Sequence, residues 1–178
     1  QGKSYLALVR EISEVIHKED SLYFFPSLKK GAVWQFSKGA FVGLEARHGI
    51  LETGSAVVKS IGFSVRDVIQ YMESCSLNIE EIRLSGGQAK NPLWNQLKSD
   101  MIGKRIIVPE IHDGELLGCA CVAFKGLGLY SSLIRAAQEM VHIKEEYNPD
   151  KASYDRFTCL FEKYSRMSAR IQPLAETL

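Results

Sequence analysis

Apolar residues recur every three to four positions along much of the chain, and this periodicity predicts amphipathic helices. The first begins at Tyr5, directly after Ser4, whose hydroxyl oxygen can accept a hydrogen bond from the first helical turn. The longest apolar stripe predicts a helix over residues 51–74, which Gly62 weakens locally. Further helices are predicted over residues 92–103, 115–127, 131–144 and 150–171.

Shorter apolar and aromatic runs between the helices predict β-strands over residues 22–28, 40–44, 81–84 and 105–109. Pro26 interrupts the first run, so we expect that strand to be short or to lie at a sheet edge. From Glu81 onward strands alternate with helices, which predicts an α/β fold with parallel pairing in that part. The segment 115–127 is apolar nearly all round and rich in small residues, so we expect this helix to press closely onto a sheet.

The composition is that of one folded domain, because the chain has 178 residues, of which 46% are hydrophobic and 24% charged. A net charge of +1 and the lack of a long apolar stretch give no reason to expect a nucleic-acid or membrane partner. The four cysteines and four histidines are too scattered to predict disulfides or a metal site, which favours a reduced, cytoplasmic compartment. The chain begins in helical periodicity without an initiator Met, so we expect a fragment of a longer protein.

The turn after the third predicted strand carries the most informative chemistry. Gly86 and Gly87 end the strand, and Asn91 and Pro92 open the next helix as a favourable N-cap and first residue. Glycines have no Cβ, so a ligand can lie directly against the backbone, and the helix N-terminus adds a partial positive charge. In an open α/β sheet a nucleotide is expected at such a crevice, although a turn of this kind by itself is most often only a tight connection.

A longer pattern extends from this turn. The sequence reads Gly86-Gly87-x-x-x-Asn91-x-x-Trp94-x-Gln96-x-x-x-Asp100-x-x-Gly103, then Pro109, then Leu117-Gly118-x-Ala120-x-x-Ala123-x-x-Gly126-x-Gly128. This pattern resembles the signature of the C-terminal domain of the FGGY carbohydrate kinases. Segments 22–26, 38–44 and 147–150 are also similar to that family, so the resemblance covers residues 4–168 in register.

The resemblance implies an actin-like ATPase, ribonuclease-H-like α/β fold with a central mixed sheet flanked by helices. It also implies that residues 1–178 are the C-terminal nucleotide-binding domain of a kinase that uses ATP and Mg²⁺. Gly86 and Gly87 would form the wall against adenine and ribose, while Gln88 and Asn91 would make neighbouring nucleotide contacts. Gln88 stands where many members have a third glycine, so its side chain can add a hydrogen bond or narrow the pocket.

Three other matched residues are interpreted as structural. We expect Trp94 to pack, Gly103 to end its helix, and Asp100 to satisfy a backbone group or a helix neighbour rather than to touch a substrate, since a buried carboxylate without a partner is costly.

Three features depart from the family pattern. Between Pro26 and Gly39 the chain lacks the usual G-E-R-x-P segment, and Lys29 or Lys30 could replace the arginine's charge but not its bidentate geometry. Lys59 lies in a helix where most members carry an acid. The catalytic aspartate, the sugar-binding residues and the phosphate loop are expected in an N-terminal part that precedes residue 1, so we assign no catalytic and no metal-binding residue in this chain.

The favoured hypothesis is therefore the ATP-binding half of a carbohydrate kinase, which transfers the γ-phosphoryl group of ATP to a sugar hydroxyl. A ketopentose such as xylulose is the expected sugar, bound mainly by the missing N-terminal domain. The alternatives are a non-catalytic nucleotide-binding or interaction module of the same fold, and a generic α/β domain. The sequence leaves the choice of sugar and the oligomeric state open, a homodimer included.

Overall fold

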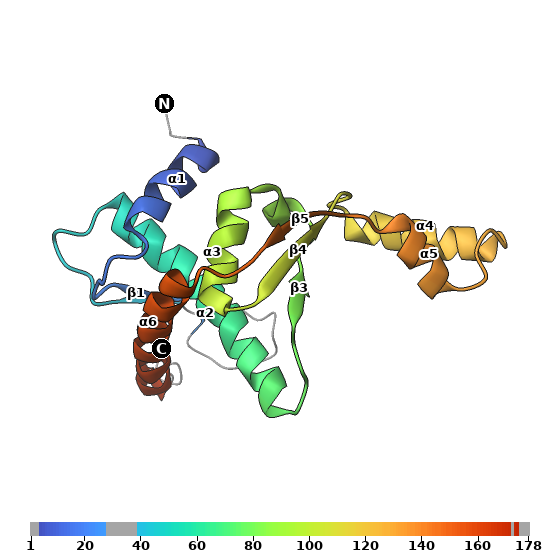
Figure 1. Cartoon of the computed structure of the whole chain (residues 1–178). Helices are drawn as coiled ribbons and strands as arrows, with labels where there is room; N and C mark the ends of the chain where they lie inside the picture. Colours follow the sequence, from blue (N-terminus) through green and yellow to red (C-terminus); the bar gives the residue numbers. More distant parts are fainter. Residues whose placement is uncertain (1–3, 28–38, 172, 175–178) are drawn as a thin grey trace.

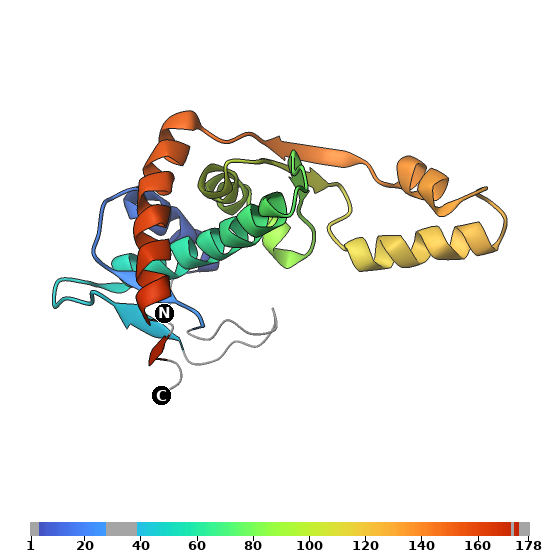
Figure 2. The same ribbon diagram turned by 90° about the horizontal axis from the view of Figure 1, so that it is seen from below.

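The computed structural model describes residues 4–27, 39–171 and 173–174. The body of the molecule contains the helices α1 (Tyr5–Val15), α2 (Ile50–Ser74), α3 (Pro92–Ile102) and α6 (Lys151–Ile171). The helices α4 (Gly114–Gly126) and α5 (Leu133–Met140) form an arm that extends away from this body (Figures 1 and 2). Among the helices described, none has the length and apolar character needed to cross a membrane.

The strands form two small sheets. In the first, β1 (Tyr23–Phe25) and β2 (Ala40–Val42) pair antiparallel, and β1 ends just before Pro26. In the second, β3 (Glu81–Arg83) and β4 (Arg105–Pro109) pair parallel, while β5 (Ile143–Tyr147) pairs antiparallel to β4. The strand order is β3-β4-β5. The mixed sheet expected from the sequence is therefore confirmed, and the helices predicted over 51–74 and 92–103 correspond to α2 and α3.

The main core lies where α1, α2, α3 and α6 meet the first sheet. The ring of Phe25 stacks on that of Tyr164, with centroids 4.6 Å apart. Gly62 allows α3 to approach α2 closely, because an added Cβ there would lie 2.5 Å from Sδ of Met101. The glycine that weakens the helix pattern is thus a packing requirement. The buried residues of this core are Ile12, Ile16, Tyr23, Phe25, Phe63, Trp94, Leu97, Met101, Phe157, Leu160, Phe161 and Tyr164.

A buried arginine joins three of these helices. Arg66 of α2 donates hydrogen bonds to the carbonyl oxygen of Met101 at 3.1 Å and to Oγ1 of Thr158 at 3.0 Å. Its guanidinium carbon also lies 4.7 Å from the ring centroid of Phe161 and 4.9 Å from that of Tyr154. The charge is therefore buried together with hydrogen-bond acceptors and aromatic faces, which offset its desolvation.

The helix predicted over residues 131–144 is wrong in its last four residues. The helix α5 ends at Met140, and residues 143–147 form β5 instead. Glu146 faces Ile107 in the register with β4. The apolar positions that predict the helix end at Val141, and the pairing with β4 decides the conformation of the residues that follow, since tertiary context overrides local pattern. The parallel pairing expected from Glu81 onward consequently holds for β3 and β4 only.

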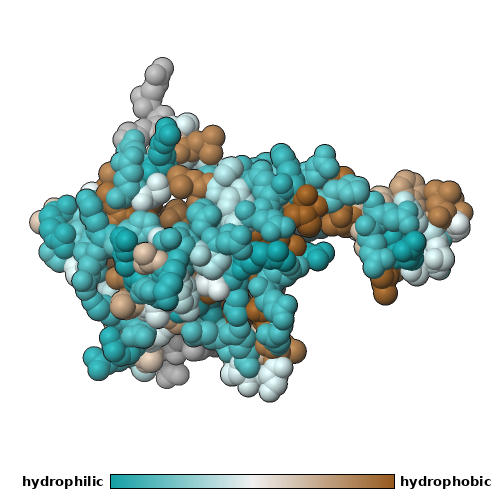
Figure 3. Space-filling view, viewed as in Figure 1, coloured by the Kyte–Doolittle hydropathy of each residue, from teal (hydrophilic) through white to brown (hydrophobic). Residues whose placement is uncertain are grey.

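The expectation that the helix over 115–127 presses onto a sheet is also wrong for the described chain. The main contact of α4 is with α5, and Sγ of Cys121 lies 3.8 Å from Sδ of Met140. No sheet face lies beside α4 among the described residues. The apolar side chains on its outer face therefore form hydrophobic surface on the arm, which is brown in Figure 3. The exposed apolar side chains of α4 and the residue after it are Leu116, Val122, Phe124 and Leu127.

A substitution at Gly103 tests the packing between the end of α3 and α6. Its φ of +74° is left-handed, and an added Cβ would lie 2.3 Å from Cε2 of Tyr154. We expect Gly103→Ala to lower the free energy of unfolding by about 1–3 kcal/mol, measured by urea denaturation of the chain. Gly118→Ala is the control, because Gly118 lies within α4 and an added Cβ there meets nothing within 4 Å. Equal destabilisation by both variants would contradict this account.

Candidate functional site

The turn between β3 and α3 exposes bare backbone. The N–H of Gly86 donates to the carbonyl oxygen of His112 at 2.6 Å, which joins the turn to the segment between β4 and α4. Gly86 has a φ of +79°, a conformation that favours glycine. An added Cβ at Gly86 or Gly87 would meet no heavy atom within 4 Å. The two glycines therefore present main chain that a ligand can reach without displacing a side chain.

Asn91 fixes where α3 begins. Its Oδ1 accepts a hydrogen bond from the N–H of Trp94 at 3.2 Å, and Pro92 follows as the first helical residue. The N-cap expected from the sequence is thus confirmed. Nδ2 of the same side chain is buried and has no hydrogen-bond partner among the described residues. The amide is therefore held in place on one side and has a free donor on the other.

Gln88 forms part of the wall of an apolar groove. Its Oε1 accepts a hydrogen bond from Nε1 of Trp94 at 3.4 Å. The groove has a volume of about 580 Å³, a size typical of small-molecule sites, and its other walls come from α1 and α2. The residues that line it are Tyr5, Leu8, Val9, Ile12, Ile50, Thr53, Gly54, Val57, Val58, Ile61, Gln88 and Trp94.

A more polar cavity adjoins the same turn. It has a volume of about 300 Å³ and lies where β3 and β4 end and α4 begins. Asp113 caps α4, since its Oδ1 accepts a hydrogen bond from the N–H of Leu116 at 3.1 Å. The residues that line the cavity are Ser85, Gly86, Gly87, Lys90, His112, Asp113, Gly114 and Glu115. The carboxyl ends of adjacent parallel strands are where ligands bind in open α/β sheets.

The three residues interpreted as structural behave as expected. Trp94 is buried in the main core, and Gly103 ends α3 in a left-handed conformation. Oδ1 of Asp100 accepts hydrogen bonds from the backbone N–H of Asp150 at 2.9 Å and from Nε2 of Gln96 at 2.8 Å. Burial raises the pKa of Asp100, and these two hydrogen bonds oppose that shift. Its carboxyl group thus joins α3 to the start of α6.

Lys98 is a buried cation that sequence reasoning missed. Nζ has no hydrogen-bond partner among the described residues and lies 5.3 Å from the ring centroid of Trp94. Desolvation lowers the pKa of Lys98 to about 8. In the sequence it is one polar position of an amphipathic helix, and its spacing of four residues from Trp94 is the only signal that could have drawn attention to it.

Lys59, the base in place of the family's acid, is buried in α2. Desolvation lowers the pKa of its ammonium group, and the charge of Asp20 opposes this shift. The other departure from the family pattern, between Pro26 and Gly39, falls mainly on residues 28–38, which lie outside the described residues.

Residues 22–127 match the C-terminal domain of the FGGY family of carbohydrate kinases. This match covers more than half of the chain, and the chain therefore belongs to that family. The family expected from the sequence pattern is thus confirmed.

Individual relatives agree with this assignment. A probable L-xylulose kinase of Pasteurella multocida is 22% identical over 170 residues, which are 96% of this chain and 34% of the relative. The crystal structure of xylulose kinase from Rhodospirillum rubrum matches with a TM-score of 0.76 at 20% identity, over 96% of this chain and 34% of that one. Plasmodium falciparum glycerol kinase with ADP matches with a TM-score of 0.67 at 18% identity, over 89% and 33%.

The structural likenesses show that this chain has the fold of the FGGY kinases, the actin-like ATPase fold expected from the sequence. The chain spans about a third of the length of the relatives that it matches.

None of the His, Cys, Asp and Glu side chains of the described residues form a group of three or more that could hold a metal ion.

Lys98→Met tests the cost of the buried charge. In the folded chain the pKa of Lys98 is about 8, below the ordinary lysine value of about 10.4 in an unfolded chain. Below pH 8 the ammonium group is charged in the folded and in the unfolded chain, and its burial on folding lowers the free energy of unfolding. Above the pKa of lysine in the unfolded chain the group is neutral in both states, and this cost disappears. We therefore expect Lys98→Met to raise the free energy of unfolding at pH 7, and each kcal/mol of this increase should raise the melting temperature by about 2–4 °C.

The difference between variant and wild type should shrink as the pH rises from 8 toward 10.5. Lys151→Met, at an exposed position of α6, is the control. Constant stabilisation by Lys98→Met across the range would show that packing, not charge, is responsible.

Proposed function

We propose that this chain is the ATP-binding part of a carbohydrate kinase. The observation that carries the proposal is the open Gly86–Gly87 backbone, which lines a polar cavity, next to Gln88, which lines an apolar groove. Family membership supports the proposal, and a fold neighbour of known structure, the glycerol kinase of Plasmodium falciparum, contains ADP. The relatives named as xylulose kinases favour a ketopentose such as xylulose as the sugar.

The nucleotide is recognised by features of opposite character. The apolar groove, with Trp94 and Gln88 in its wall, suits a flat base such as adenine. The backbone of Gly86 and Gly87 lets the ribose approach closely, and the unpartnered Nδ2 of Asn91 can donate a hydrogen bond. The N-terminal end of α3 adds a partial positive charge that favours an anion.

The chemistry of the transfer is assigned to the longer protein. Phosphoryl transfer requires a positioned γ-phosphate and a carboxylate that accepts the proton of the sugar hydroxyl. We assign neither to a residue of this chain, and we place the sugar site and the phosphate loop in the longer protein. Mg²⁺, which neutralises phosphate charge in such reactions, would be held by the nucleotide and by groups outside the described residues. Four free cysteines accord with a reduced compartment such as the cytoplasm.

One observation favours a second candidate, a nucleotide-binding or interaction module without catalysis. Lys59 places a buried base where most family members carry an acid. Sugar-dependent ADP release by the full-length protein decides between the two candidates.

Gly87→Asp tests the site itself. A carboxylate at this position fits the open space but occupies the path to the backbone and repels phosphate groups. We expect the ATP affinity of the full-length protein to fall at least about tenfold in calorimetric titration, which is about 1.4 kcal/mol, without a change in melting temperature. Asn78→Asp introduces the same charge at an exposed loop position and is the control. Unchanged ATP affinity in Gly87→Asp would show that the turn is not part of the ATP site.

Asn91 offers a test that separates capping from binding. Asn91→Ala removes both the cap and the amide, and should cost about 1 kcal/mol of stability. Asn91→Ser keeps an oxygen that can accept from the N–H of Trp94 but loses Nδ2. We expect Asn91→Ser to retain near-wild-type stability and to bind ATP more weakly. Full ATP affinity in the serine variant would show that Asn91 acts only as a helix cap.

A further inference from the structure

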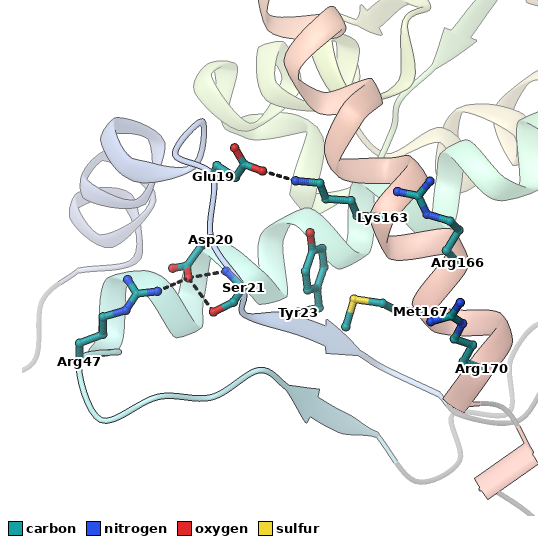
Figure 4. A pocket seen from close by; sticks show the side chains of 9 residues that line it. All are labelled: Glu19, Asp20, Ser21, Tyr23, Arg47, Lys163, Arg166, Met167 and Arg170. Carbon is teal, nitrogen blue, oxygen red and sulfur yellow. Dashed lines mark hydrogen bonds and ion pairs between the residues drawn. The ribbon is translucent and has the colours of Figure 1, made fainter.

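A second cavity lies on another side of the body, between the segment that precedes β1 and the C-terminal half of α6 (Figure 4). It has a volume of about 590 Å³, within the usual range for small-molecule sites. It shares no residue with the groove or the polar cavity beside Gly86. The residues that line it are Glu19, Asp20, Ser21, Tyr23, Arg47, Lys163, Arg166, Met167 and Arg170.

Both carboxylates of this cavity already have partners. Glu19 forms an ion pair with Lys163, and this contact lowers the pKa of Glu19. Oδ1 of Asp20 accepts hydrogen bonds from the N–H of Ser21 at 2.7 Å and from Arg47 at 3.0 Å. Burial opposes ionisation of Asp20, but these groups together with His48 lower its pKa. The two acids are therefore ionised and neutralised by neighbours.

The cations of the cavity are in excess of its acids. Four basic side chains line it, against two carboxylates. Arg166 and Arg170 lie one helical turn apart on α6, on either side of Met167, and have no ion pair or hydrogen bond within the described part of the chain (Figure 4). Glu162, one turn before Arg166, lies beyond ion-pair distance from it. Two guanidinium groups are thus available to an anion.

Tyr23 adds a neutral donor. Its ring is buried in the main core, and its hydroxyl points toward the side of the cavity on which Lys163 lies (Figure 4). Burial raises the pKa of this hydroxyl, which therefore stays protonated. No hydrogen-bond partner of the hydroxyl is found among the described residues. The cavity accordingly combines paired guanidinium groups, a fixed hydroxyl donor and the apolar side chain of Met167.

We propose that this cavity binds a small molecule that carries a phosphate group, either a phosphate monoester or an inorganic polyphosphate, at Arg166, Arg170 and Tyr23. Guanidinium groups form bidentate, charge-assisted hydrogen bonds with phosphate oxygens, which a lone ammonium group cannot do. The volume admits the body of a sugar phosphate beside Met167. The site is separate from the proposed ATP site and does not depend on it.

The test uses calorimetric titration of the chain with inorganic pyrophosphate and, separately, with ribose 5-phosphate. Arg166→Gln/Arg170→Gln removes both guanidinium groups at exposed positions and preserves side-chain polarity. Lys151→Gln/Arg156→Gln makes the same charge change at exposed positions nearer the start of α6, outside the cavity, and is the matched control. Each titration is repeated in the Gly87→Asp background, so that binding at the turn is recognised separately.

We expect saturable binding of at least one probe that weakens about tenfold or more in Arg166→Gln/Arg170→Gln and stays within about twofold in the control. Gly87→Asp should leave this binding unchanged even if it abolishes ATP binding. Tighter binding of ribose 5-phosphate indicates a monoester as the natural ligand, and tighter binding of pyrophosphate a polyphosphate.

Three results would overturn the proposal. The first is that neither probe binds saturably at concentrations up to about 1 mM. The second is that the matched control loses as much affinity for the probe as Arg166→Gln/Arg170→Gln does. The third is that only Gly87→Asp loses affinity for the probe. Binding of an RNA oligonucleotide but of neither small probe would likewise reject it, in favour of a nucleic-acid surface.

Discussion

The position of α3 depends on the buried guanidinium group of Arg66. It binds the carbonyl oxygen of Met101 at the carboxyl end of α3 and the side chain of Thr158 on α6, from its own place on α2. A cation at a helix C-terminus is favoured by the helix dipole, and the free carbonyl groups of the last turn need a donor. Removal of one partner would leave either a buried charge or a buried acceptor unsatisfied. The three helices are therefore held together as one unit, and the opposite end of α3 is fixed with them.

That opposite end is where the candidate site begins. Asn91 fixes the first turn of α3, and Nδ2 of Asn95 donates to the carbonyl oxygen of Ala89 at 2.7 Å, which also fixes η1 (Gly87–Lys90). The hydrogen bond from the N–H of Gly86 to the carbonyl oxygen of His112 joins the turn to the segment between β4 and α4. The exposed glycines thus rest on a rigid support, so little conformational entropy remains to be lost when a ligand binds there.

The sequence predicted those features whose cause is local. The cap at Asn91, the helix end at Gly103 and the Gly86–Gly87 turn each follow from the chemistry of one or two residues, and the structure contains all of them. The errors concern segments whose conformation or packing is decided by their tertiary surroundings. Residues 143–147 pair with β4, although the predicted helix extends to residue 144, and α4 contacts α5 where a sheet was expected. The groove wall from α1 and α2 and the burial of Lys98 also required the tertiary arrangement, because helical periodicity does not say which helices become neighbours.

Lys98 is a buried cation on α3, the helix that begins at the candidate site. Its ammonium nitrogen lies 5.3 Å from the ring centroid of Trp94, whose Nε1 donates a hydrogen bond to Gln88 in the groove wall. A cation in this position, added to the partial charge at the start of α3, raises the potential felt by an anion at the turn. The same burial lowers the pKa of Lys98, so the charged ammonium group lowers the free energy of unfolding of the chain without a ligand. An anionic ligand would help to stabilise this charge. By linkage, an anion bound at the turn would raise the pKa of Lys98, and protonation of Lys98 would in turn tighten the binding of that anion.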